Sequence, residues 1–210
     1  MPRVAAIIPA CNEERTSGEV VGTVARSPLV DDVIVVNDGS RDATMETTRR
    51  RAARVIALHA NQGKGGATAV GLAATNAQII PLLDGDLVGL TTRHVEDLLQ
   101  PVLAGTAEVC VGQIQRDLMQ TRFPNFSGLR ALRRAVLENI SHLENTGFRI
   151  EIAVSRHARI SGLCTCPAPI DHLTHVLKQE KHGVLPGHVG KLKTTRGIPQ
   201  WSGRNGRSRT

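Results

Sequence analysis

Aromatic residues are scarce in this chain, which has no Tyr, three Phe and one Trp among 210 residues. Proteins that bind single-stranded nucleic acid stack the bases on aromatic rings, so the scarcity argues against such a binding platform. We therefore expect no nucleic-acid partner. Long hydrophobic runs are lacking as well, because no apolar stretch approaches the roughly 20 residues that a membrane-spanning helix needs. A transmembrane helix is not expected.

Cysteine is also sparse, and the four cysteines at positions 11, 110, 164 and 166 do not show the spacing of a disulfide framework. Met1–Arg3 leads directly into a strand-like run, without the pattern of a secretory leader. Both observations favour a reducing, cytoplasmic compartment. Cys164 and Cys166, with His172 and His175, offer zinc-type ligands, but their spacing matches no usual zinc knuckle, so structural zinc is disfavoured.

Acidic residues are outnumbered, since the net charge is +7 and the isoelectric point about 9.9. This balance favours anionic partners such as phosphates or an acidic membrane face. Much of the charge is local, because the segment 191–209 holds two Lys and four Arg and no acid. Residues 183–210 are accordingly predicted to be a poorly ordered basic tail that could meet anionic lipid at the inner membrane face. Residues 1–182 suffice for one domain with its own core.

Apolar strands alternate with helices along most of the chain. The pattern predicts buried strands at 4–9, 32–37, 54–58, 79–83 and 108–113, and helices ending near residues 26, 53, 74 and 103. Such alternation is typical of an α/β fold with a mostly parallel sheet flanked by helices. Beyond residue 113 the pattern weakens, and we predict helices at 129–142 and 147–156 and a late strand within 167–177.

The strand within Ile79–Leu87 ends in two carboxylates, Asp84 and Asp86, on either side of Gly85. Open α/β sheets bind ligands beyond the carboxyl ends of their strands. Both carboxylates could face one hard cation, which prefers oxygen ligands and bridges readily to phosphate. However, Asp-Gly is also ordinary turn chemistry, and this stretch alone does not decide between the two interpretations.

Polar residues follow two other predicted strands, with Asn12-Glu13-Glu14 after the first and Asp38-Gly39-Ser40 after the second. Parallel strands end at the same edge of a sheet, so these acids should converge with the Asp84 pair and could bind a base or ribose. The Gly-rich loop 61–66 offers backbone amides at a helix start plus Lys64, which suits phosphate. The spacing is not that of a Walker loop, and the first strand is not followed by a dinucleotide fingerprint.

Four segments occur in order: Ile-Ile-Pro-Ala-Cys-Asn-Glu-Glu (7–14), Val-Val-Asn-Asp-Gly-Ser-Arg-Asp-Ala-Thr (35–44), Asn-Gln-Gly-Lys-Gly-Gly-Ala (61–67) and Leu-Asp-Gly-Asp-Leu (83–87). Together they resemble the GT-A glycosyltransferases of family 2, whose fold is Rossmann-like. Later segments resemble the branch near the dolichyl-phosphate mannose synthases and the glucosyl-3-phosphoglycerate synthases; they are 89–90, 101–105, 127–131, 147–151 and 174–181. The resemblance covers roughly Val4 to Lys181, and four ordered motifs are more specific than one.

The resemblance implies roles for individual residues on the donor side. Asp86, with Asp84 nearby, would hold Mg²⁺ or Mn²⁺, which neutralises the charge on a departing nucleoside diphosphate. A late histidine can complete the metal shell in such enzymes, and His175 matches that place, although a lone histidine is more often a polar strand-end residue. The nucleotide side would be lined by Pro9, Glu13, Asp38, Lys64 and Asp84.

On the acceptor side, the resemblance implies that Ser127 and Arg130 approach a phosphate or carboxylate. Glu151, together with Asp86, is the catalytic candidate, as a base or as a positioning group. Simpler interpretations exist: Glu151 as a solvated helix residue, and Arg130 on an exposed basic helix face, which the run of arginines at 130–134 favours. Asn37 stands where the family commonly has Asp, and Arg149 where Gly is frequent.

The implied function is metal-dependent transfer of a sugar from a UDP- or GDP-linked donor to a phosphorylated small molecule or a polyprenyl phosphate. A nucleotidyltransferase is one alternative, but it would need a Gly-rich loop after the first strand. A non-catalytic nucleotide-sugar binding protein is another, and would have a broken metal motif, whereas Asp84 and Asp86 are both present. The sugar, the acceptor and the stereochemical outcome stay open, as does oligomeric state, a homodimer included.

Overall fold

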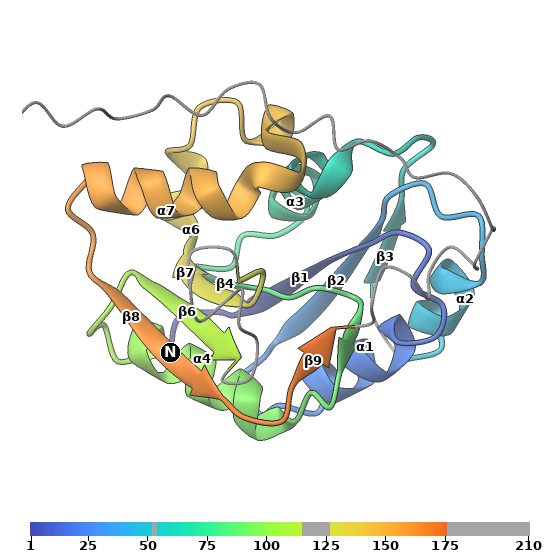
Figure 1. The fold of residues 1–210 in the computed structure, drawn as a ribbon, viewed down its shortest axis with the longest axis horizontal. Helices are drawn as coiled ribbons and strands as arrows, with labels where there is room; N and C mark the ends of the chain where they lie inside the picture. Colours follow the sequence, from blue (N-terminus) through green and yellow to red (C-terminus); the bar gives the residue numbers. More distant parts are fainter. Residues whose placement is uncertain (52–53, 115–126, 176–210) are drawn as a thin grey trace, which may run out of the picture. The chain divides into compact units, whose positions relative to one another are not determined.

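The computed structural model describes residues 1–51, 54–114 and 127–175, with only the backbone for Phe148 and His175. These residues belong to one compact unit, Met1–Leu177. Its centre is a seven-stranded sheet in the order β3-β2-β1-β4-β7-β6-β8 (Figure 1). The strands are β1 (Ala5–Ala10), β2 (Asp32–Asn37), β3 (Arg54–Ala57), β4 (Ile79–Leu82), β6 (Val109–Ile114), β7 (Arg130–Arg133) and β8 (Thr165–Ile170). A separate two-stranded ribbon pairs β5 (Leu87–Val88) with β9 (Thr174–His175).

The sheet is mostly parallel, as predicted. β1 runs parallel to β2 and β4, β2 to β3, and β6 to β8. The exception is β7, which is antiparallel to both of its neighbours, β4 and β6. Because β7 runs the other way, its first residue lies at the edge where the parallel strands end.

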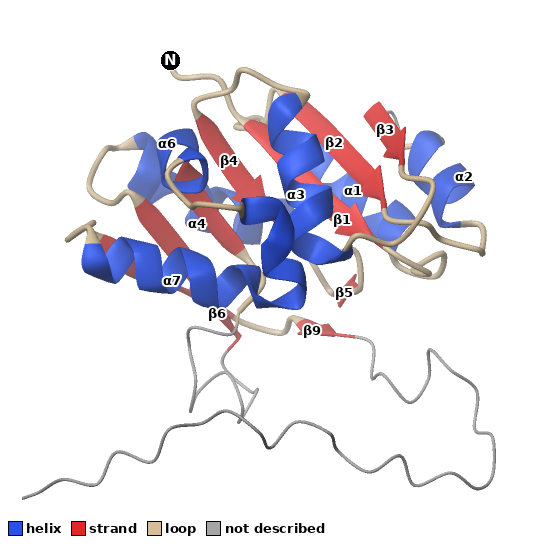
Figure 2. Ribbon diagram, turned by 90° about the horizontal axis from the view of Figure 1, so that it is seen from above, coloured by secondary structure: helices blue, strands red, loops and turns tan. Residues whose placement is uncertain are grey.

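Helices cover both faces of the sheet (Figure 2). Alternate residues of β1 show why both faces are apolar: Ala6 and Ile8 pack with α1 and α4, whereas Ala5 and Ile7 pack with α3, α6 and α7. Ile7 and Ile8 are both fully buried, and each such side chain contributes about 1.5–3 kcal/mol. The helices are α1 (Ser17–Ala25), α2 (Thr44–Arg49), α3 (Gly63–Ala73), α4 (Thr92–Leu103), α6 (Arg134–Glu138) and α7 (Ile150–Ile160), with the 3₁₀ segment η2 (Leu143–Arg149) before α7.

The start of α4 illustrates how local sequence sets a boundary. The hydroxyl of Thr91 accepts a hydrogen bond from the backbone amide of His94 at 3.2 Å, and Nδ1 of His94 accepts one from the amide of Thr91 at 3.3 Å. This reciprocal pair satisfies two of the amides that a helix start leaves without partners. The predicted end of this helix near residue 103 is confirmed.

The late part of the chain corrects the predictions. The segment 129–142 was expected to be one helix, but it forms β7 and then the short α6. The segment 147–156 spans the end of η2 and the start of α7, and the predicted late strand divides into β8 and β9. The predicted basic tail, 183–210, lies outside the described residues. No helix in the described ranges is long and apolar enough to cross a membrane.

Candidate functional site

The loop 83–87 packs against the loop that follows β1, so the predicted convergence of strand ends is observed. The hydroxyl of Thr16 donates a hydrogen bond to the carbonyl oxygen of Gly85 at 2.8 Å. A Cβ placed on Gly85 would lie only 2.1 Å from Oε2 of Glu13, so a side chain at this position would displace the Glu13 carboxylate. Asp84 and Asp86 are therefore held on either side of a glycine in contact with Glu13.

Asp38 ties the end of β2 to the start of α3. Its two carboxylate oxygens accept hydrogen bonds from the amides of Gln62 at 2.7 Å and Gly63 at 2.9 Å, and the residue is only 4% exposed. A carboxylate at a helix start is stabilised by the helix dipole and by these amides. The expectation of bare amides at this helix start is thus wrong for Gln62 and Gly63, which bind Asp38.

A cavity of about 560 Å³ opens where β1, β2 and β3 end. Its size lies in the range of small-ligand sites. Asn61 Nδ2 donates a hydrogen bond to Cys11 Sγ at 3.2 Å, and burial, with Asp38 nearby, raises the pKa of the Cys11 thiol. Two lining residues, Arg41 within the segment 35–44 and His59, were not among the predicted site residues. The cavity is lined by Cys11, Asn12, Gly39, Ser40, Arg41, Leu58, His59, Ala60 and Asn61.

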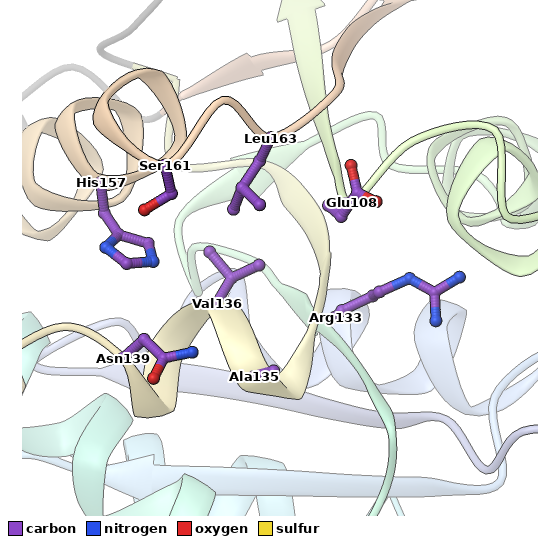
Figure 3. Close-up of a pocket in the computed structure, with 8 residues that line it drawn as sticks. All are labelled: Glu108, Arg133, Ala135, Val136, Asn139, His157, Ser161 and Leu163. Atoms are coloured by element: carbon purple, nitrogen blue, oxygen red, sulfur yellow. The ribbon is translucent and has the colours of Figure 1, made fainter.

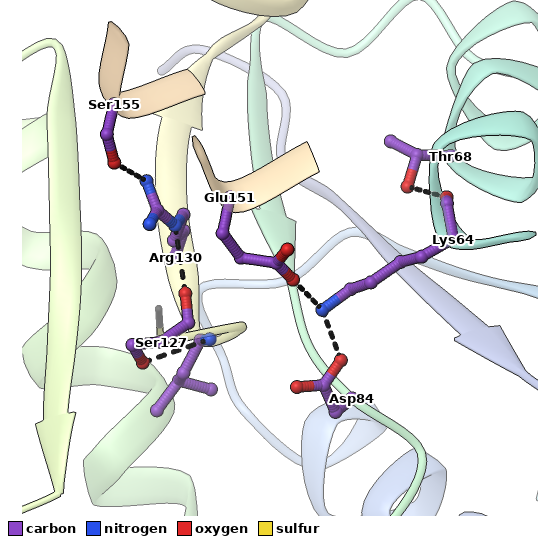
Figure 4. A network of polar contacts seen from close by, with 8 residues as sticks. Lys64, Thr68, Asp84, Ser127, Arg130, Glu151 and Ser155 are labelled. Carbon is purple, nitrogen blue, oxygen red and sulfur yellow. Dashed lines mark hydrogen bonds and ion pairs between the residues drawn. The ribbon is translucent and has the colours of Figure 1, made fainter. Parts of the chain in front are cut away.

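Next to the loop 83–87, Lys64 forms ion pairs with two carboxylates (Figure 4). Its Nζ contacts Asp84, and it lies 2.5 Å from Oε1 of Glu151, a residue 87 positions along the chain in α7. The Lys64 side chain is 13% exposed. Burial lowers the pKa of Lys64, but the charges of Asp84 and Glu151 outweigh this and raise it above its ordinary value, so Lys64 stays cationic.

Arg130 is a second buried cation beside the same carboxylates. It is 1% exposed, and its guanidinium donates from Nε to the carbonyl oxygen of Ser127 and from Nη1 to the hydroxyl of Ser155, both at 3.0 Å. Burial lowers its pKa to about 10, although Glu151 and Asp84 oppose the shift, so Arg130 remains charged near neutral pH. The exposed helix face favoured for Arg130 is wrong, because the residue begins β7. Ser155 was missed, although its i+4 spacing from Glu151 was a usable signal.

Gly128 lets the backbone approach this network closely. A Cβ on Gly128 would lie 2.0 Å from Oδ2 of Asp84 and 2.5 Å from Nζ of Lys64. Such contacts are far inside normal van der Waals distances. The missing side chain of Gly128 thus leaves the space that the Lys64–Asp84 pair occupies.

Gly128→Ala should destabilise the protein by about 1–3 kcal/mol, the usual cost of overpacking, because Asp84 and Lys64 must both move. Urea denaturation followed by circular dichroism measures the change. Gly22→Ala in α1 is the matched control, since a Cβ there finds its nearest neighbour at 3.4 Å, and alanine is favoured in helices. Equal stability of the two variants would contradict the packing role of Gly128.

The donor atoms near Asp86 suit a divalent cation that prefers oxygen. Asp84 and Asp86 supply carboxylates, and Leu87 pairs with His175, so the backbone of β9 runs beside this loop. The His175 side chain lies outside the described part of the chain. Within that part, no three His, Cys, Asp or Glu residues cluster as a metal cage, at this loop or around Cys164 and Cys166. Two carboxylates still fit Mg²⁺ or Mn²⁺, which commonly combine one or two carboxylates with phosphate oxygens and water.

A second cavity, of about 430 Å³, lies at the opposite edge of the sheet (Figure 3). None of the residues predicted for the site lines it. Its walls come from the starts of β6 and β8, the end of β7, α6 and the last turn of α7. The lining residues are Glu108, Arg133, Ala135, Val136, Asn139, His157, Ser161 and Leu163.

Comparison with known families agrees with this geometry. Residues 5–160 match the model of glycosyl transferase family 2. The chain belongs to this family. The match runs from the start of β1 to the end of α7 and so contains the loop 83–87, Lys64, Arg130 and Glu151.

Within family 2, the chain is similar to enzymes with two kinds of acceptor in their names. It is 37% identical over 109 residues to a glucosyl-3-phosphoglycerate synthase of Mycolicibacterium smegmatis. This alignment covers 48% of this chain and 36% of that relative. It is 33% identical over 91 residues to a dodecaprenyl-phosphate galacturonate synthase of Rhizobium johnstonii, covering 39% of this chain and 27% of the relative. The matched segments thus span about a third of the length of these relatives.

A solved structure shows the same fold. The crystal structure of glucosyl-3-phosphoglycerate synthase from Mycobacterium tuberculosis, in complex with Mn²⁺, UDP-glucose and phosphoglyceric acid, superposes with a TM-score of 0.73. The alignment covers 84% of this chain and 72% of that chain at 23% sequence identity. This likeness confirms the expected GT-A fold.

Proposed function

We propose that this family 2 chain transfers a sugar from a nucleoside diphosphate sugar to a phosphorylated acceptor, with Mg²⁺ or Mn²⁺. One observation carries the proposal: the carboxylates of Asp84 and Asp86, a nucleoside-sized cavity and two buried cations meet at one edge of the sheet. An anionic donor and an anionic acceptor both suit an edge that has buried cations and carboxylates able to hold a metal ion. The similar synthases of M. smegmatis and R. johnstonii carry sugar-transfer activities in their names.

For the donor, we propose that the cavity at the ends of β1, β2 and β3 takes the nucleoside. Pro9, Glu13 and Asp38 do not line the cavity themselves, but each stands within two residues of one that does, and we propose that they form the base and ribose side. UDP-glucose in the similar Mycobacterium tuberculosis complex favours uridine as the base. The contacts of Asp38 leave it rigid, which reduces the entropy lost on binding.

For the cation, we propose that Asp86 binds directly, with Asp84 and His175 nearby. When bound, the cation would neutralise negative charge on the departing diphosphate. Asp84 also pairs with Lys64, which ties the position of the loop 83–87 to that of α3. Mn²⁺ and Mg²⁺ both occur in complexes of the similar synthase.

For the acceptor, we propose that Ser127 and Arg130 lie on its side of the site and that Glu151 is the base or positioning group. The serines 127 and 155 fix the Arg130 guanidinium, and Lys64 holds Glu151. A group that accepts a proton must be oriented toward it, and an ion pair with a buried lysine supplies that orientation. The acceptor would be a phosphorylated small molecule, such as phosphoglycerate, or a polyprenyl phosphate.

The wider setting is part of the same proposal. The catalytic domain would span residues 1–182, with the tail 183–210 as a peripheral contact to anionic lipid, and the chain could pair as a homodimer. The four cysteines at positions 11, 110, 164 and 166 are all free thiols, which supports a reducing, cytoplasmic compartment.

Titration calorimetry tests the donor site. UDP or GDP, titrated in Mn²⁺ and separately in EDTA, should bind only with the metal, and the nucleotide that binds identifies the base. Asp86→Ala should abolish this metal-dependent binding, because it removes the direct carboxylate ligand. Asp97→Ala removes a half-buried carboxylate that pairs with Arg93 in α4; it is the matched control and should bind as the wild type does. If neither UDP nor GDP binds, the proposal is rejected and a nucleotidyltransferase is favoured, which titration with nucleoside triphosphates would test.

A further inference from the structure

One side of α7 presents a stripe of basic and apolar side chains to solvent. Arg149, at the end of η2, and four residues of α7 are exposed: Ile152, Arg156, Arg159 and Ile160. At 100° per residue these five fall within about 100° of the helix circumference. We call them the α7 stripe. The opposite side of α7 packs into the core through Ile150, Val154 and Ala158.

The composition of the α7 stripe is unusual for this protein. Ile152 is 43% exposed and Ile160 is 69% exposed. They are two of the four large hydrophobic side chains that are exposed within the described residues, the others being Met1 and Val88. The α7 stripe contains no acid, and none of its three arginines forms an ion pair with another described residue. In both views α7 lies over one face of the sheet, at the surface of the described part of the chain (Figures 1 and 2).

We propose that the α7 stripe docks on an anionic lipid bilayer. Arginine guanidinium groups pair with phosphate headgroups, and exposed isoleucines between them gain free energy by entering the boundary of the acyl chains. The charge argues against a second copy of the chain as the occupant, because two α7 stripes would set arginine against arginine. This docking goes beyond the proposed sugar transfer and can be tested without it.

The position of α7 links the docking surface to the site. Glu151 and Ser155, which contact Lys64 and Arg130, belong to the same helix as the α7 stripe. A helix with its side chains is about 10–12 Å across, so a bilayer held by the α7 stripe would lie about that far from Glu151. If the proposed function is right, a lipid-linked phosphate could then reach the acceptor side from the bilayer.

Vesicle sedimentation tests the docking. The full chain is mixed with vesicles of phosphatidylcholine alone, or of phosphatidylcholine and phosphatidylglycerol in equal parts, at low salt. Each arginine near an anionic surface is worth about a five-fold change in partitioning. Wild type should bind the anionic vesicles and not the neutral ones, and the triple variant Arg149→Gln, Arg156→Gln, Arg159→Gln should bind on the order of 100-fold more weakly. Ile152→Ser with Ile160→Ser should bind more weakly at every salt concentration, since the apolar contact is lost while the arginines remain.

The matched control removes three exposed arginines elsewhere: Arg3→Gln, Arg15→Gln and Arg49→Gln. It has the same net charge as the stripe variant, and all variants retain the tail 183–210. The control should bind within about three-fold of wild type, because the α7 stripe is unchanged. Failure of wild type to bind anionic vesicles overturns the proposal. So does undiminished binding by the stripe variant, which would assign the contact to another part of the chain, and so does an equal loss in the control, which would show that only net charge matters. Thermal melts that match wild type establish that each variant is folded.

Discussion

Arg130→Met should cost about 3–5 kcal/mol of unfolding free energy, the range found when one partner of a buried charge network is removed. The guanidinium of Arg130 is buried, and it lies close enough to Glu151 and Asp84 for both carboxylates to influence its pKa. Without it, these carboxylates share Lys64, and the carbonyl oxygen of Ser127 loses its side-chain donor. Since small domains have only about 5–15 kcal/mol of stability, urea denaturation should show a large shift in midpoint.

The same strand supplies the control for Arg130. Arg133 ends β7 but is exposed, so Arg133→Met should change stability by no more than about 0.5 kcal/mol. Arg130→Lys retains the charge but cannot reproduce the forked contacts to Ser127 and Ser155, and an intermediate loss is expected. Similar stabilities for the variants at positions 130 and 133 would show that Arg130 does not support the fold.

Lys64→Met should lower the turnover number for sugar transfer by about 100-fold, the scale associated with a displacement of about 1 Å in a reacting group. Lys64 lies between Asp84 and Glu151, so its removal leaves two carboxylates that repel each other. Steady-state kinetics of the proposed transfer, with the nucleotide sugar whose base calorimetry has identified, should show the larger effect on kcat, and calorimetry should show a smaller effect on binding of the nucleoside diphosphate. Thr68→Val, which removes a hydroxyl that donates to the Lys64 carbonyl at 2.7 Å, is the control and should change kcat by less than about three-fold.

The raised pKa of Lys64 also predicts a pH response. Its folded-state pKa lies above the ordinary value of 10.5, so its contribution to stability is complete below about pH 10 and is lost only as pH rises further. Between pH 6 and 9, the difference in unfolding free energy between wild type and Lys64→Met should therefore stay constant. A difference that shrinks within that window would mean that Lys64 loses its proton there and that its two ion pairs do not hold.

Local signals in the sequence were sufficient for the parallel part of the fold. β2 has its predicted bounds because Asp32–Asn37 is a short, nearly continuous apolar run, which is typical of a strand buried on both faces. α4 begins at Thr92 because of the Thr91 cap and ends at Leu103, as predicted. The acids at the ends of β1, β2 and β4 were expected to converge because parallel strands share an edge, and Glu13 does reach Gly85.

β7 could not be predicted in the same way. Leu129–Arg134 is rich in Leu, Ala and Arg, which favour helices, yet Arg130–Arg133 pairs with β4 and β6. Strand formation there depends on two neighbours distant in sequence, and such tertiary context overrides local propensity. Arg130 is buried because β7 pairs with β4 and β6, and the sequence of β7 does not indicate that pairing.

The ion-pair network also lay beyond local signals. Lys64 and Glu151 are 87 residues apart, and nothing in either segment indicates the other as its partner. The motif around Asp38 predicts a ligand contact, but it does not indicate that both carboxylate oxygens also bind the start of α3. The motifs predict which residues gather at the site, but which of them pair with one another depends on the packing of distant segments.

The reversed direction of β7 makes one part of this chain open to exchange. The chain leaves the sheet at Ile114, the end of β6, and re-enters it at Arg130, and both residues lie at the edge that carries the site. A connection that starts and finishes at one edge can change length without moving a strand, and each doubling of its length costs only about 0.6 kcal/mol. Both ends of the segment 115–126 are therefore anchored at the edge that carries the site, on strands that a replacement of different length need not reposition.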